Sequence, residues 1–253
     1  MHRGNQQNDR LLFSKVIFKR RRIMLNKEYK YILFDLDRTL WDLDLNAKNN
    51  VFRLLDVYGL SKIDKNHFFE MFDHINHLLW ARYEKGDLSK EALRSERFYQ
   101  TLLEFGVDNP VLAAEFGEEY LKSMPLQKAL TPYAFEVLSG LHERGVRMAI
   151  ISNGFKEVQY KKLENSGIAK FFDAVMISEE QGVHKPSPIL FKRALNAIGG
   201  DKKLSLMVGD DFVNDIEGAM IFGIDQFFYN YKSVPCDGGP TYDSNDLRDL
   251  LTF

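Results

Sequence analysis

Short apolar runs alternate with helical patterns along most of this chain. The runs are rich in β-branched and bulky apolar residues, and they predict buried strands at residues 30–36, 146–153, 172–178, 204–210 and 225–230. Helical patterns lie between the strands, at residues 132–144, 155–166, 186–198 and 214–222, and a glycine follows each of them. Strands that alternate with single helices predict an α/β fold with a parallel sheet.

The first connection between strands breaks this rhythm. Residues 45–130 carry helical patterns such as "HFFEMFDHINHLLWARYE" and almost no strand signal. This segment is far too long for a single crossover helix, so it predicts an all-helical cap domain inserted into a Rossmann-like core. We therefore expect a core formed by residues 24–44 and 131–253, a cap at residues 45–130, and hinges near residues 42–46 and 131–132.

Composition and charge narrow the class of protein. Residues 1–23 hold seven basic residues and one acidic residue, which predicts a basic, disordered extension, whereas the whole chain has a formal net charge of -2. No run approaches the roughly 18 to 20 apolar residues that a membrane-spanning helix needs. Cys236 is the single cysteine, which excludes an intramolecular disulfide and suits a reducing compartment. We expect a cytoplasmic monomer or dimer that binds neither nucleic acid nor a membrane.

Polar residues follow the predicted strands at the same edge of the sheet. The first strand ends in "DLD", the second in "SN" and the fourth in "GDDFVND", and "HKPSP" precedes the helix after the third. The residues concerned are Asp35, Asp37, Ser152, Asn153, Lys185, Asp210, Asp211 and Asp215. Ligands of parallel sheets bind at the carboxyl ends of the strands. A buried carboxylate is costly unless it is paired, neutralised or bound to a metal. This grouping therefore predicts a catalytic or metal-binding site.

In these motifs the sequence resembles the phosphatases of the haloacid dehalogenase superfamily. "DLDRT" matches the first motif of that family, D-x-D-x-T, "ISN" matches the second, "HKPSP" the lysine motif and "GDDFVND" the acidic fourth motif, in this order over residues 31–230. Through "SNGF" and "ISEEQGVHKPSPILF" it is most similar to the branch that removes phosphate from nucleoside 5′-monophosphates. The resemblance implies a Mg²⁺-dependent phosphomonoester hydrolase that acts through an aspartyl phosphate on a small phosphorylated metabolite.

The resemblance also implies roles for the acidic residues. Asp35 is expected to be both the nucleophile and a ligand of Mg²⁺, because a cation must bridge the carboxylate and the phosphate dianion. Asp37 is expected to be the general acid and base, since a carboxyl crowded by other anions can hold a proton, and its backbone carbonyl to bind the metal. Asp210 supplies a second carboxylate. Either Asp211 or Asp215 is the further ligand or supports the others.

The remaining candidates surround the phosphate or the hinge. Lys185 is expected to offset anionic charge on nucleophile and phosphate, and Ser152 and Asn153 to lie against the phosphoryl oxygens. Thr39 is expected to fix the loop that binds the substrate. Trp41, just past that loop, is a candidate substrate contact, although hinge packing explains it equally well.

Several alternatives stay open at this point. A phosphatase for a sugar phosphate, such as acylneuraminate 9-phosphate or phosphoglycolate, shares the core motifs; a phosphomutase or a receiver-type module fits them less well. The second aspartate, Asp37, argues against dehalogenation. The aromatic residues of the cap fit a hydrophobic core better than a surface that stacks on a base, and the cap histidines fit a solvated helix face better than a metal site.

Overall fold

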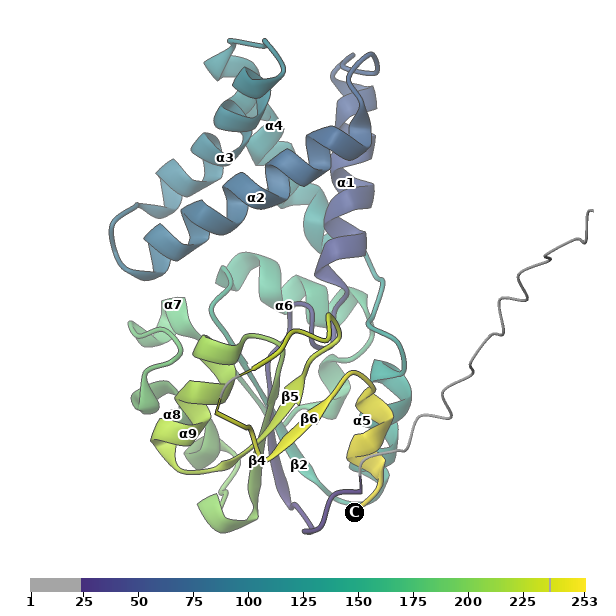
Figure 1. The fold of residues 1–253 in the computed structure, drawn as a ribbon, viewed down its shortest axis with the longest axis vertical. Helices are drawn as coiled ribbons and strands as arrows, with labels where there is room; N and C mark the ends of the chain where they lie inside the picture. The colour runs from purple at the N-terminus through teal and green to yellow at the C-terminus, as the bar shows by residue number, and fades with distance from the viewer. Residues whose placement is uncertain (1–23, 237) are drawn as a thin grey trace, which may run out of the picture.

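The structure is a computed structural model that describes residues 24–236 and 238–253. The predicted basic extension, residues 1–23, lies outside the described residues. Helices α1 to α4 stand above one end of an α/β core in Figure 1. Among the described residues, no helix combines the length and apolar character needed to cross a membrane.

The core is built on a parallel sheet of six strands in the order β3-β2-β1-β4-β5-β6. The strands are β1 (Tyr31–Phe34), β2 (Arg147–Ser152), β3 (Ala174–Ile177), β4 (Ser205–Gly209), β5 (Asp225–Tyr229) and β6 (Tyr242–Ser244). β1 lies in the middle, where Phe34 pairs with Ile150 on one side and Val208 on the other. The predicted α/β fold with a parallel sheet is confirmed, and the carboxyl ends of β1 and β4 meet at the centre of one sheet edge.

Helices cover both faces of the sheet because successive strand residues point to opposite sides. Ile32 and Phe34 belong to one hydrophobic cluster, which includes residues of α5 (Ala134–Glu143) and α6 (Lys156–Asn165). Leu33 belongs to a second cluster, with α8 (Pro188–Ala197) and α9 (Gly218–Phe222). The short helices of the core are α7 (Ser178–Gln181) and the turns η2 (Ala169–Phe171), η3 (Lys202–Leu204) and η5 (Leu247–Leu251).

The segment predicted as one helix at residues 214–222 consists of two parts. A π-helical turn, η4 (Phe212–Glu217), comes directly after β4 and continues into α9. Asp211 caps this turn by accepting hydrogen bonds from the backbone N–H groups of Val213 and Asn214. The wider turn was not predicted, because apolar periodicity does not distinguish it from an α-helix.

Between β1 and α5 the chain forms α1 (Leu43–Val57), α2 (Lys65–Glu84), α3 (Lys90–Glu104), α4 (Pro110–Ser123) and the turn η1 (Met124–Leu126). Their interior is aromatic: the rings of Phe72 and Phe98 stack with centroids 4.8 Å apart, and Phe116 lies 4.9 Å from Phe98. These rings are buried, as expected for a core. The side chains of His67, His74 and His77 are exposed, as expected for a solvated helix face.

The two segments that join these helices to the core lie side by side. Trp41 forms a backbone bridge to Leu130, and the side-chain amide of Asn46 bonds both the N–H and the C=O of Ala129. Thr131 donates its hydroxyl to the carbonyl of Thr39 at 2.7 Å. The exit from the loop after β1 and the return to α5 are therefore tied together at one point, as a hinge region would be.

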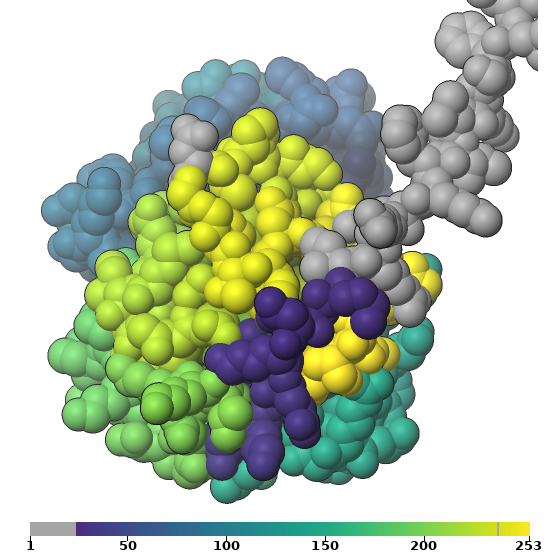
Figure 2. Space-filling view, turned by 60° about the horizontal axis from the view of Figure 1, so that its bottom comes forward, coloured from purple at the N-terminus to yellow at the C-terminus, as the bar shows by residue number. Residues whose placement is uncertain are grey.

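At the opposite end of the core, the first described residues pack against the C-terminal ones, purple against yellow in Figure 2. The backbone N–H of Leu25 donates to Thr252 Oγ1 at 3.0 Å. The hydroxyl of Tyr29 donates to Asp225 at 2.7 Å, and the ring of Tyr29 packs edge-on against Tyr242. These contacts pin both ends of the described chain far from the strand edge where the acidic residues gather.

Candidate active site

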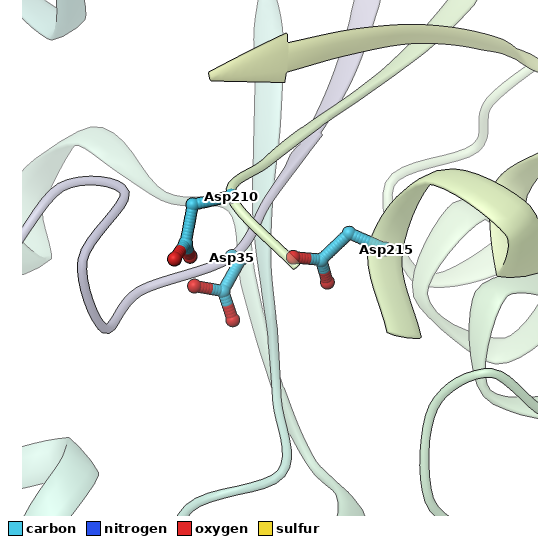
Figure 3. Close-up of side chains that lie close together, drawn as sticks. All are labelled: Asp35, Asp210 and Asp215. Atoms are coloured by element: carbon cyan, nitrogen blue, oxygen red, sulfur yellow. The ribbon is translucent and has the colours of Figure 1, made fainter. Parts of the chain in front are cut away.

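Three carboxylates meet at the centre of the strand edge. Asp35 follows β1, Asp210 follows β4, and Asp215 projects from η4. One carboxylate oxygen from each lies within 4.8 Å of the other two, and Figure 3 shows the three side chains turned toward a common space. The side chain of Asp215 is fully buried and Asp35 is 7% exposed. Residues up to 180 positions apart are thus brought together by the pairing of two neighbouring strands.

The backbone before Asp210 must be bare for this arrangement. Gly209 has no side chain, and a Cβ placed there would overlap the carboxylate of Asp215. Asp215 is further held by the backbone N–H of Asp211, which donates to it at 3.1 Å. Asp215 therefore joins the carboxylate cluster, whereas the side chain of Asp211 caps η4.

Lys185 is the cation of the cluster. Its Nζ lies 2.6 Å from Oδ1 of Asp35 and 2.6 Å from Oδ1 of Asp215, and the residue is 4% exposed. Asn153 fixes the backbone of this lysine: its Oδ1 accepts from the N–H of Lys185 at 2.8 Å, and its Nδ2 donates to the carbonyl at 3.2 Å. The amide of Asn153 thus positions the lysine.

The cluster holds three carboxyl groups and one ammonium, and burial and mutual repulsion make it costly for all three carboxyl groups to be ionised. Burial raises the pKa of Asp35 even though Lys185 lowers it, and burial raises the pKa of Asp215 to about 8. Burial, with repulsion from Asp35 and Asp215, raises the pKa of Asp210 well above its ordinary value. Burial alone would lower the pKa of Lys185, but the two carboxylates outweigh it and raise that pKa. One ammonium does not balance three carboxylates.

This donor set suits a hard divalent cation. Mg²⁺ prefers oxygen ligands, commonly one or two carboxylates completed by water and phosphate oxygens. The elevated pKa values of the carboxylates show how strongly a further positive charge would be stabilised there. The cluster of Asp35, Asp210 and Asp215 therefore fits Mg²⁺, in agreement with the expectation from the sequence.

Asp37 faces a different environment from the one the sequence predicts. We expected its carboxyl to be crowded by other anions; instead, Lys162 donates to one oxygen at 2.6 Å and Gln159 to the other at 2.9 Å. Both come from α6, three positions apart on one face of the helix. Lys162 is 4% exposed and its ammonium lies 4.3 Å from the ring centre of Trp41.

Sequence reasoning did not single out Lys162 or Gln159. Both match a surface helix in composition, and only the packing of α6 against the loop after β1 turns them inward. The available signal was weak: Gln159 and Lys162 lie on the same face of α6 as its apolar residues Val158 and Leu163.

The other candidates support the loop. Thr39 is fully buried and donates to Oδ1 of Asp210 at 3.1 Å, so it holds a carboxylate of the cluster. Ser152 accepts from Gln159 at 2.7 Å and from the backbone N–H of Gly154. Trp41 is fully buried beside Leu130 and Lys162. This position fits hinge packing, the alternative to substrate contact considered from the sequence.

α2 lies across the carboxyl edge of the sheet and touches the loops around the cluster. Near its middle, Asp73 accepts a hydrogen bond from Arg38 of the loop after β1 at 3.3 Å. At its end, Glu84 accepts from Asn153 at 2.9 Å. Trp80 packs against Phe155, with ring centres 4.9 Å apart. The helical segment therefore covers the carboxylates from the side on which the loops end.

Comparison with known proteins agrees with this fold. Residues 29–223 match the model of the haloacid dehalogenase-like hydrolases, and the chain belongs to that family. Its predicted family and enzyme class are thereby confirmed. The chain is 30% identical to the pyrimidine 5′-nucleotidase PynA of Streptococcus pneumoniae, over 88% of this chain and 94% of that protein.

Two further relatives cover nearly the whole chain. The pyrimidine 5′-nucleotidase YjjG of Escherichia coli is 28% identical, over 88% of this chain and 96% of that protein. The crystal structure of the putative hydrolase YfnB of Bacillus subtilis, described as bound to magnesium and as revealing interdomain movement, superposes with a TM-score of 0.79 at 26% identity. It covers 90% of this chain and all of that one.

Proposed function

We propose that this protein is a Mg²⁺-dependent phosphatase that hydrolyses nucleoside 5′-monophosphates through an aspartyl phosphate on Asp35. The observation that carries the proposal is the buried cluster in which Asp35, Asp210 and Asp215 meet Lys185 at the carboxyl ends of β1 and β4. In this proposal residues 45–130 act as the cap over a core of residues 24–44 and 131–253.

The reaction has two steps, both at phosphorus. A carboxylate oxygen of Asp35 attacks the phosphorus while the bond to the leaving oxygen breaks, and Asp37 gives a proton to that oxygen. Asp37 takes up this proton before the step, on an oxygen that then no longer accepts a hydrogen bond from Lys162 or Gln159. A water molecule then attacks the phosphorus of the aspartyl phosphate. Asp37, now ionised, takes the proton from this water, and the bond between phosphorus and Asp35 breaks to release inorganic phosphate.

The neighbouring residues orient and neutralise the reacting groups. Bound Mg²⁺, held by Asp35, Asp210 and Asp215 together with the backbone carbonyl of Asp37, would supply charge that offsets the repulsion between carboxylate and phosphate dianion. Lys185 keeps an ammonium 2.6 Å from the nucleophile, where it stabilises the charge that develops in the transition state.

The loop residues complete the phosphate site. The hydroxyl of Ser152 and the backbone N–H groups near it are donors for the phosphoryl oxygens, and Asn153 positions Lys185. Lys162 and Gln159 hold the two oxygens of Asp37, and Thr39 holds Asp210. Trp41 stiffens the hinge beside them.

Two things support nucleotides as the substrate. The relatives PynA and YjjG, both named pyrimidine 5′-nucleotidases, align over 88% of this chain. The cap also presents partly buried rings at its contact with the core, Trp80 and Tyr83, beside Phe155. A base that stacks on aromatic side chains gains about 1 to 3 kcal/mol.

The test is a comparison of kcat/KM with Mg²⁺ for deoxyuridine monophosphate, thymidine monophosphate, N-acetylneuraminate 9-phosphate and phosphoglycolate. We expect the nucleotides to be preferred by about tenfold or more, a transition-state difference of about 1.4 kcal/mol. A tenfold preference for either of the other two would replace the nucleotidase assignment with that of a sugar-phosphate or glycolate phosphatase. Failure to turn over any phosphomonoester would refute the enzyme proposal.

A further inference from the structure

The helical cap holds a buried guanidinium, that of Arg97, with one edge that has no hydrogen-bond partner among the described residues and is called the open edge below. Arg97 of α3 is 3% exposed, and its Nη1 donates to Oδ1 of Asn76 at 3.3 Å. Its Nε and Nη2 are buried and have no hydrogen-bond partner among the residues that the structure describes. Two aromatic rings lie beside it: the ring centres of Tyr120 and Phe98 are 4.8 and 5.2 Å from the guanidinium carbon.

Such a group is costly unless something binds it. A buried charge without a partner loses its hydration, and each unmade hydrogen bond adds a desolvation penalty. Burial lowers the pKa of Arg97 to about 10, so it is still charged at neutral pH, and contacts with aromatic faces compensate it only in part. Arg38, by contrast, is bonded by the carboxylates of Asp44 and Asp73.

Arg97 lies on the side of the cap that faces the carboxylate cluster. Its partner Asn76 is one turn along α2 from Asp73, which bonds Arg38 of the loop between β1 and α1. Tyr120, whose ring Arg97 covers, has its pKa raised to about 12 by burial, and the charges that act on it include both Arg97 and Asp37. α2 and α3 stand over the carboxyl edge of the sheet (Figure 1).

The open edge has a defined shape. Nε–H and one N–H of Nη2 point in parallel from one side of the planar guanidinium, a fork that binds two acceptor atoms or a single carbonyl oxygen. In the proposed function the phosphate has Lys185, the hydroxyl of Ser152 and the Mg²⁺ that the carboxylates would bind to hold it. The fork is therefore available for the part of the substrate that extends from the phosphate toward the cap.

We propose that the open edge of Arg97 binds hydrogen-bond acceptors of the leaving group, the O2 carbonyl of a pyrimidine base and, in cytosine, the adjacent N3. This inference rests on the proposed function and deepens it, because it names the residue that distinguishes a pyrimidine nucleotide from a phosphate ester without a base. Stacking on aromatic rings accepts any base, whereas the fork requires acceptors at this edge of the base.

The test compares Arg97→Met with the wild-type protein on deoxyuridine monophosphate and on ribose 5-phosphate, which carries no base. We expect kcat/KM for the nucleotide to fall by about tenfold to hundredfold, mainly through a higher KM, and kcat/KM for ribose 5-phosphate to change by less than about threefold. Arg97→Lys keeps the charge but lacks the fork, so it should lose nearly as much. Arg53→Met, which removes an exposed arginine of α1 bonded to Glu119, is the matched control and should change neither.

Melting temperature separates binding from a structural role. Removing an uncompensated buried charge should leave the melting temperature of Arg97→Met unchanged or raise it, whereas a structural arginine would lower it. Equal losses on both substrates, or a lowered melting temperature with no selective loss, would overturn the role of Arg97 while leaving the nucleotidase proposal intact. A wild-type protein that does not prefer the nucleotide would overturn both.

Discussion

Two groups of charged side chains, the carboxylate cluster and the contact between the cap and the core at Lys90, differ in their exposure to water. In the carboxylate cluster, the side chains of Asp35, Asp215 and Lys185 are 9%, 0% and 4% exposed. At the start of α3, away from the hinge, the cap contacts the core, and this contact is called the free edge of the cap. There Lys90 bonds Glu157 and Glu179 of the core at 3.0 and 2.6 Å, and the three side chains are 18%, 40% and 25% exposed. Arg94 bonds Glu157 as well.

The difference in exposure implies different roles for the two groups of charged side chains. Buried charges act strongly on one another, so the pKa values of the carboxylates are raised, and the carboxylate cluster suits a cation. Exposed ion pairs are worth little because water and salt screen them. Breaking contacts of that kind costs little free energy, so in the proposed function they allow the cap to open for substrate entry and product release.

The largest effect is expected inside the cluster. Asp35→Asn should reduce turnover by at least about a thousandfold, because an amide cannot serve as the carboxylate nucleophile. The melting temperature should not fall, since the substitution removes one charge from a group of crowded anions. Steady-state kinetics and thermal unfolding with Mg²⁺ measure both.

The control for Asp35→Asn is Asp211→Asn, which makes the same chemical change one residue from Asp210. Asn caps a helical turn as well as Asp does, so this variant should keep turnover within about tenfold of the wild-type value. Wild-type activity in Asp35→Asn would refute the covalent mechanism.

A smaller loss is expected one step away from the cluster, at the lysine that holds Asp37. Lys162→Met keeps the side-chain length and the contact with Trp41 but removes the hydrogen bond to Asp37. We expect kcat for an alkyl phosphate to fall by about tenfold to hundredfold, within the range that general acid catalysis contributes. p-Nitrophenyl phosphate should lose less in the phosphoryl-transfer step, because its leaving group needs little protonation.

Single-turnover rates of both substrates measure that difference directly. Lys161→Met changes the neighbouring exposed lysine of α6 and should leave both rates unaltered. If Lys162→Met slows the two substrates equally, Lys162 does not act through the proton transfer of Asp37.

The sequence predicts the site residues at the strand ends better than those around them. The strand-end residues follow from local patterns and sheet topology, whereas the others depend on packing between distant elements. Strands β1 to β5 each contain an apolar run, so these five strands could be placed within about two residues. The topology of parallel sheets then brings Asp35 and Asp210 together. The short edge strand β6 depends on pairing with β5 and has no pattern of its own.

The residues that the sequence did not reveal are those whose direction depends on packing between helices and loops. Lys162 is preceded by another lysine, Lys161, and only the placement of α6 buries the second of the two. Arg97 lies in a strongly charged stretch of α3 that reads as surface until α2 and α4 cover it. Lys162 and Arg97 are buried by contacts with other elements, and the sequence pattern of their own helices does not indicate such burial.

The smallest effect is expected at the free edge of the cap. Glu157→Gln removes the charge that bonds Lys90 and Arg94, and it should cost less than about 1 kcal/mol, as exposed ion pairs do. At this chain length that corresponds to a fall in melting temperature of about 2 to 4 °C at most. About 1 M salt should bring the wild-type protein to the behaviour of the variant, because the Debye length then falls to about 3 Å.

Glu164→Gln, at another exposed glutamate of α6, is the control and should change nothing. A fall of about 10 °C that salt does not reproduce would mean that the cap edge is locked like the buried cluster, and the contrast between the two regions would no longer hold.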